Sequence, residues 1–157
     1  MAADSPMIHL ISRFFGFLGA RPLRPTEQVQ VVSILSPSLC RLFYRQCFQD
    51  QRHAFEVARR VANRPELQEA ALVHDIGKSS VSLGALGRSC ATLWGSTSLP
   101  VWGQWRTYLE HASHGAELLE RHGAGYRSIA FTRHHPGPPP DGFDPAGWAA
   151  LTHADES

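Results

Sequence analysis

Adjacent histidine and aspartate side chains, His74 and Asp75, are the most informative feature of this 157-residue sequence. Imidazole and carboxylate groups are ligands for divalent metal ions, whereas an unpaired polar group in an apolar core costs free energy. Further groups of both kinds recur before and after the pair, at His53, His111, His134, His135 and Asp155. The pattern predicts a metal site that the fold assembles from distant segments of the chain.

These candidate ligands are sufficient for one or two metal ions. One ion could be held by His53, His74, Asp75 and Asp155. Adding His111 and one of the two adjacent histidines supplies a second ion, bridged to the first by a carboxylate. Two divalent ions and two carboxylates leave a pocket of about +2, which favours phosphate oxygens and lowers the pKa of bound water. Mixed nitrogen and oxygen ligands suit Mn, Fe, Co, Ni or Zn.

The adjacent histidines His134 and His135 are not equally placed, because neighbouring residues on a helix point about 100° apart. We expect His134 to be the direct ligand and His135 to be a further ligand or a residue that orients one. Gly115 lies one turn after His111, where the missing side chain lets another helix or a substrate approach closely.

Cationic side chains near these ligands are candidates for phosphate binding. Lys78, the only lysine, follows the His-Asp pair by three residues. It could bind a substrate phosphate as a point charge, or it could simply be a solvated lysine that favours the helix dipole. Most of the nearby arginines are expected on the surface, with one or two binding phosphate: Arg52, Arg106, Arg127 and Arg133.

The composition suits one globular domain without a nucleic-acid signature. Hydrophobic residues make up 43% of the chain and the net charge is +1, which argues against both disorder and a basic binding surface. The three cysteines form no CxxC pair, which argues against a disulfide framework and favours a reducing cytoplasm. The apolar stretch 7–18 is too short to span a bilayer. We expect an amphipathic helix that packs on the domain, with a membrane-surface or partner-binding helix as the alternative.

Proline, glycine and helical periodicity predict an all-α fold. Helices are expected after Pro25 over 28–35, after an N-cap at Ser36, after a cap at Asp50, from Pro65 to the His-Asp pair, and over 81–93, 104–121, 126–133 and 145–155. Gly77 is predicted to close the fourth of these in a left-handed conformation. The proline-rich run 136–142 cannot be helix interior. Residues 1–49 are interpreted as helices that pack on a core of 50–157.

Residues from about 50 to 157 resemble the HD-domain superfamily of metal-dependent phosphohydrolases. The family pattern is a histidine, a His-Asp doublet, later histidines and a closing aspartate on a helical bundle, matched here by His53, His74-Asp75 and Asp155. The HD-GYP branch of this superfamily has the most similar local sequence, at residues 72–78, at His111 with 115–119, and at the double histidine. That branch cleaves cyclic di-GMP and has glutamate where Pro136 stands here, so this substrate is not expected.

The resemblance implies hydrolysis of a nucleotide or other small phosphate mono- or diester. Two alternatives remain open. Some HD-domain proteins are di-iron oxygenases with a similar ligand set, and others could be non-catalytic signalling modules that bind metal or nucleotide. The sequence as given ends two residues after Asp155, so we expect either a weakly held last turn of that helix or a longer protein from which this chain is truncated. The oligomeric state is not defined by any of these features.

Overall fold

The computed structural model describes residues 21–77 and 112–157, and every regular element within these ranges is helical. The prediction of an all-α fold is thereby confirmed. The labelled helices are α2 (Pro25–Ile34), α3 (Pro37–Phe43), α4 (Phe48–Arg60), α5 (Pro65–Val73), α8 (Tyr126–His134) and α9 (Pro145–Glu156), and residues 112–121 are also helical. Over the described ranges, no helix is long and apolar enough to cross a bilayer. The helices predicted over 7–18 and 81–93 lie outside the described residues.

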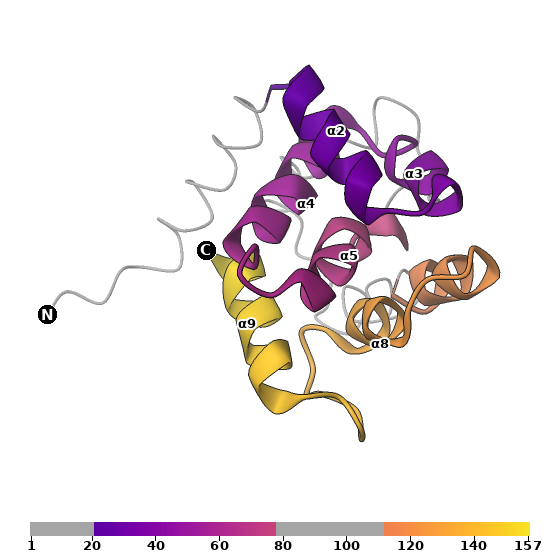
Figure 1. Cartoon of the computed structure of the whole chain (residues 1–157). Helices are drawn as coiled ribbons and strands as arrows, with labels where there is room; N and C mark the ends of the chain where they lie inside the picture. Colours follow the sequence, from indigo (N-terminus) through magenta and orange to yellow (C-terminus); the bar gives the residue numbers. More distant parts are fainter. Residues whose placement is uncertain (1–20, 78–111) are drawn as a thin grey trace, which may run out of the picture.

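Helix α5 lies at the centre of the described helices, between α2 and α3 on one side and α8 and α9 on the other (Figure 1). It contacts all four of these helices and also α4. The run Ala70 to Val73 is buried along its whole length, as expected for a helical turn whose residues are apolar on all faces. His74 follows this run directly, so the core itself positions the first residue of the His-Asp pair.

One hydrophobic cluster joins the described N-terminal helices to the rest of the fold. Val31 of α2 and Leu39 and Phe43 of α3 are fully buried in it. Trp148 of α9 is 6% exposed and packs edge-on against Phe131 at 5.1 Å between ring centroids. The described part of residues 1–49 therefore shares its core with residues 50–157.

Among the described residues, the helix starts predicted after Ser36 and at positions 65, 126 and 145 are confirmed, whereas the helix predicted over 28–35 begins earlier, at Pro25. The start predicted at 104 lies outside the described residues. Proline is the first residue of α2, α3, α5 and α9, where its missing N–H is not needed. The Ser36 hydroxyl accepts a hydrogen bond from the Leu39 amide at 3.3 Å, as an N-cap should. The predicted cap at Asp50 is wrong, because α4 begins at Phe48 with Cys47 at the cap. Asp50 lies in the first turn instead, near the positive end of the helix dipole.

The predicted left-handed Gly77 is also wrong. Helix α5 ends at Val73, and among the described glycines only Gly123 and Gly142 have positive φ. Nδ1 of His74 lies 2.9 Å from the carbonyl oxygen of Ala71. The imidazole N–H thus donates a hydrogen bond to a carbonyl at the helix end. In a helix that ends with a left-handed glycine, a backbone N–H donates this bond instead.

A buried carboxylate on α2 fixes the orientation of α4. Two guanidinium nitrogens of Arg52 lie 3.0 and 2.8 Å from the two carboxylate oxygens of Glu27. The same guanidinium donates to the backbone carbonyls of Arg21 and Pro22. Arg52, a candidate phosphate ligand from its place in the sequence, therefore holds the chain as it enters α2.

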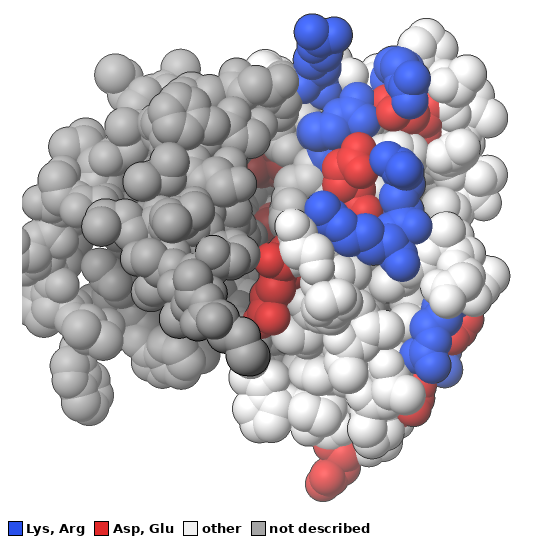
Figure 2. Space-filling view, turned by 90° about the vertical axis from the view of Figure 1, so that its left-hand side faces the viewer, with Lys and Arg blue, Asp and Glu red and all other residues white. Residues whose placement is uncertain are grey.

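Ion pairs between arginine and acidic side chains also occur on the surface of the described residues. Figure 2 shows basic side chains gathered on one face of the molecule, with acidic side chains among them. Arg59 and Glu56, for example, are 3.0 Å apart. Pairs of this kind offset much of the positive charge of neighbouring arginines.

We expect Glu27→Gln to lower the free energy of unfolding by about 2 kcal/mol near neutral pH, because hydrogen bonds to a charged group are lost. Hydrogen bonds from Arg52 and Arg24 hold the pKa of the Glu27 carboxyl well below its usual range. The folded state therefore binds the Glu27 proton less tightly than the unfolded state. The resulting stabilisation is present above the unfolded pKa of about 4.3 and is lost as the pH falls toward the folded value.

Urea denaturation between pH 2 and pH 7 measures both effects. The wild type should lose stability below about pH 4 more steeply than Glu27→Gln. Glu117→Gln is the control, since its carboxylate is 53% exposed in an ion pair with Arg121 and such pairs contribute about 1 kcal/mol or less. Equal losses in the two variants would contradict the role of Glu27.

Candidate functional site

Three imidazoles meet at the carboxylate of Asp155. Nε2 of His53 lies 2.8 Å and Nε2 of His74 lies 3.2 Å from Oδ1. Nε2 of His135 lies 3.0 Å from Oδ2. His53 comes from α4, His74 and His135 follow α5 and α8, and Asp155 lies in the last turn of α9. The fold thus brings together side chains that are far apart in the sequence.

The His-Asp pair belongs to the same group of side chains. Oδ2 of Asp75 lies 3.5 Å from Nε2 of His74. One ligand atom each from His53, His74 and Asp75 lie within 4.8 Å of one another, so this group could hold a metal ion. The predicted convergence of these residues with Asp155 is confirmed, while their binding of metal stays a prediction.

The tautomer of His74 makes this group suitable for a cation. A carbonyl oxygen only accepts, so the proton that His74 shares with Ala71 is on Nδ1. In the neutral ring Nε2 then carries a lone pair, and it faces oxygens of Asp75 and Asp155. A lone pair facing two carboxylates is repulsive unless a proton or a metal ion lies among them. Metal-binding histidines commonly donate their second ring N–H to a backbone carbonyl in this way.

The ends of three helices add to the negative potential of this group. His74 is the C-cap of α5, His135 is the C-cap of α8, and Asp155 lies in the last turn of α9. Carbonyl groups at a helix C-terminus carry partial negative charge and stabilise a nearby cation by roughly 0.3–1 kcal/mol. The backbone therefore favours a cation here in addition to the two carboxylates.

The Asp155 carboxyl is held in its ionised form although it is mostly buried. Burial by itself raises the pKa of this carboxyl. The hydrogen bonds with His135 and His53 and the proximity of His74 outweigh burial and hold the pKa well below its usual range. The group therefore presents an anionic oxygen to a prospective metal ion at neutral pH.

The adjacent histidines are placed differently, and His134 does not have the position expected of a direct ligand. His134 is the last residue of α8 and is exposed. His135 has an extended backbone, with φ −66° and ψ 137°, which directs its ring back toward Asp155. The ring is 11% exposed and stacks on Phe131, with centroids 4.5 Å apart. His135, and not His134, is therefore the member of the pair that reaches the site.

Gly115 provides the close approach that its position predicts. A Cβ atom at Gly115 would lie 3.0 Å from the backbone nitrogen of Gly77 and 3.1 Å from Cγ2 of Thr132. The helix over 112–121 therefore packs directly on the turn that carries the His-Asp pair. His111, the candidate ligand one turn earlier, and Lys78 lie outside the described residues.

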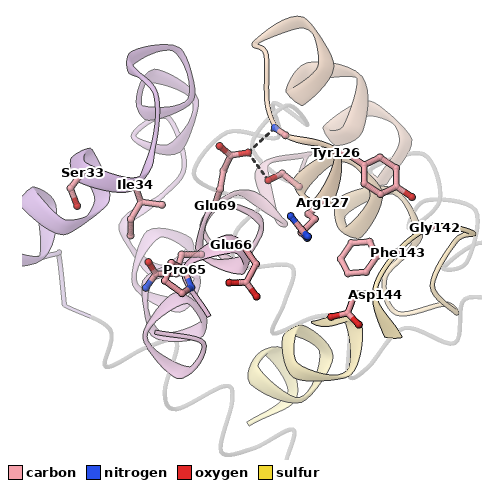
Figure 3. A pocket seen from close by; sticks show the side chains of 13 residues that line it. Ser33, Ile34, Pro65, Glu66, Glu69, Tyr126, Arg127, Gly142, Phe143 and Asp144 are labelled. Atoms are coloured by element: carbon pink, nitrogen blue, oxygen red, sulfur yellow. Dashed lines mark hydrogen bonds between the residues drawn. The ribbon is translucent and has the colours of Figure 1, made fainter. Parts of the chain in front are cut away.

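A cavity of about 650 Å³ lies at the other ends of the same helices (Figure 3). The first turns of α5 and α8 and the residues before α9 line it. Two of its three acidic side chains, those of Glu69 and Asp144, bond to groups at the starts of helices. One oxygen of Glu69 accepts hydrogen bonds from the Gly125 amide and the Ser128 hydroxyl, and Asp144 caps α9. This cavity is therefore separate from the histidine and aspartate group.

Comparison with known proteins leaves the function to be argued from the site. No protein-family model, curated protein or solved structure matches this chain.

We expect Gly115→Ala to destabilise the protein by about 1–3 kcal/mol, because the added methyl group forces the Gly77 turn and Thr132 to shift. Ser113→Ala is the matched control, since Ser113 is exposed on the same helical stretch. Thermal unfolding of the two variants measures the difference. A Gly115→Ala protein as stable as the control would show that the Gly77 turn yields without cost.

Proposed function

We propose that this protein is an HD-type metal-dependent phosphohydrolase that acts on a nucleotide or other small phosphate mono- or diester. The observation that carries the proposal is the geometry around Nε2 of His74, which lies 3.5 Å from Oδ2 of Asp75 and 3.2 Å from Oδ1 of Asp155, while Nδ1 of the same ring is turned to the Ala71 carbonyl. The order of these residues in the chain, with His53 before them, is the order in which the HD superfamily supplies its ligands.

The proposed ligands for the first ion are His53, His74, Asp75 and Asp155. Metal–ligand bonds of about 2.1 Å place neighbouring ligand atoms roughly 3 Å apart at right-angle geometry. The separations of Nε2 and carboxylate oxygens, 2.8, 3.2 and 3.5 Å, are close to this value. The mixed nitrogen and oxygen set suits Mn, Fe, Co, Ni or Zn. A second ion would need further ligands, for which His111 is the candidate.

The residues of the chain prepare the site before any substrate arrives. The Ala71 carbonyl fixes the ring of His74, and His135 holds Oδ2 of Asp155 so that Oδ1 faces His53 and His74. When bound, a divalent ion lowers the pKa of water and stabilises charge on phosphoryl oxygens. Lys78 is proposed to bind the substrate phosphate.

The first test is metal content followed by turnover. We expect protein purified without added metal to retain a transition metal by elemental analysis, and to hydrolyse members of a phosphate-ester panel with Mn, Ni, Mg or Zn. Asp75→Ala should abolish both metal retention and turnover, because it removes a carboxylate from the ligand group. Asp141→Ala is the control, since Asp141 is exposed.

Three results would contradict the proposal in different ways. Unchanged metal occupancy in Asp75→Ala would show that the metal lies elsewhere. Iron with a mixed-valent signal and no phosphatase activity would favour the di-iron oxygenase. Tight nucleotide binding without turnover in any of the metals would favour the signalling module.

A second prediction separates the adjacent histidines. We expect His135→Ala to weaken metal binding by roughly 10–100-fold, because Asp155 loses the group that orients it. His134→Ala should leave the affinity within about twofold, since residues that do not orient a ligand have little effect. Titration of metal-free protein with Zn²⁺ measures both variants. Equal weakening in the two would mean that His134 is also part of the site.

A further inference from the structure

The last turn of α9 carries Asp155 and needs support from outside the helix. The final four carbonyl groups of an α-helix have no intrahelical partner, so helix ends fray unless other groups hold them. Here the carbonyl of Ala154, the residue before Asp155, accepts a hydrogen bond from Nη1 of Arg60 at 3.1 Å. The main chain beside the central carboxylate is therefore held by a side chain from another helix.

Helix α4 contacts this turn at two points. His53 and Arg60 are seven residues apart on α4, about two turns, and therefore lie on the same face of the helix. His53 bonds to the side chain of Asp155, whereas Arg60 bonds to the backbone next to it. In Figure 1 the end of α9 lies beside α4, in agreement with the contacts between these helices.

The neighbouring arginine on α4 is used differently. Arg59 pairs with Glu56 on its own helix, and its side chain is 63% exposed. Arg60 instead reaches across to a helix C-terminus, where a guanidinium both bonds a carbonyl and interacts favourably with the helix dipole. Arg59 is therefore a matched control for Arg60, because only Arg60 is directed to α9.

We propose that Arg60 is a positioning residue for the Asp155 carboxylate. By holding the Ala154 carbonyl, it fixes the last turn of α9 so that the two oxygens of Asp155 meet His53 and His135. The role in metal binding rests on the proposed function, but the ordering of the helix end does not.

The first experiment measures ordering in metal-free protein. We expect Arg60→Met to raise the amide hydrogen-exchange rates of residues 151–156 about tenfold, because one tethering hydrogen bond is lost. Methionine keeps an apolar stem but has no donor. Arg59→Met should leave these rates within about twofold. Arg60→Lys keeps a cationic donor and should stay within about threefold of the wild type.

Metal affinity is the second readout, with Zn²⁺ as the probe. Arg60→Met should bind Zn²⁺ about tenfold more weakly than the wild type, as is common when a residue behind the ligands is lost. Arg60→Lys should restore most of the affinity, a rescue that a general effect on the fold would not produce. Arg59→Met should bind Zn²⁺ like the wild type.

The outcomes distinguish this proposal from the proposed function. Wild-type exchange rates in Arg60→Met, or equal rates in the methionine variants of Arg59 and Arg60, would overturn the positioning role. Exchange that is tenfold faster in Arg60→Lys as well would overturn it too, because the retained donor should hold the turn. A wild-type protein that binds no Zn²⁺ would overturn the metal proposal, while the exchange measurements would still decide the role of Arg60.

Discussion

The ionised Asp155 carboxylate, mostly removed from solvent, is the constraint on which the site depends. A buried charge is costly unless it is paired and hydrogen-bonded. Here the compensating groups come from different elements, His53 from α4 and His135 from the residue after α8. These helices must therefore keep their relative positions, because moving either one would leave the carboxylate poorly paired. The pairing of this buried carboxylate therefore also restricts how the helices pack.

The apolar residues of α5 help to hold these helices in their relative positions. Its residues from Ala70 to Val73 are buried among the surrounding helices, so the position of His74 is set by core packing and by the Ala71 carbonyl. The opposite ends of α5, α8 and α9 line a cavity in which Glu69 and Asp144 bond to backbone N–H groups at the starts of α8 and α9. Acidic groups thus stabilise the starts of α8 and α9, where the helix dipole is positive.

Arginine is used in this fold mainly to hold backbone and carboxylate groups in place. Arg52 binds Glu27 and two carbonyls before α2, Arg133 pairs with Glu120, and Arg60 holds the end of α9. The planar guanidinium with its several donors suits such bridging. An arginine close to a site residue in sequence is therefore weak support for phosphate binding, since Arg52 is next to His53 and serves the fold.

The sequence by itself determined the all-α class and most helix starts, because proline and capping residues act locally. It also singled out His53, His74, Asp75 and Asp155 as residues that would meet, because their side-chain types are those that share a site. Only the tertiary structure decided that His135 rather than His134 reaches Asp155, since this depends on the backbone where α8 ends. It also decided how α5 ends, where a side chain replaces the expected glycine. The contact of Arg60 with Ala154 joins residues 94 positions apart, and no local pattern encodes such a pairing.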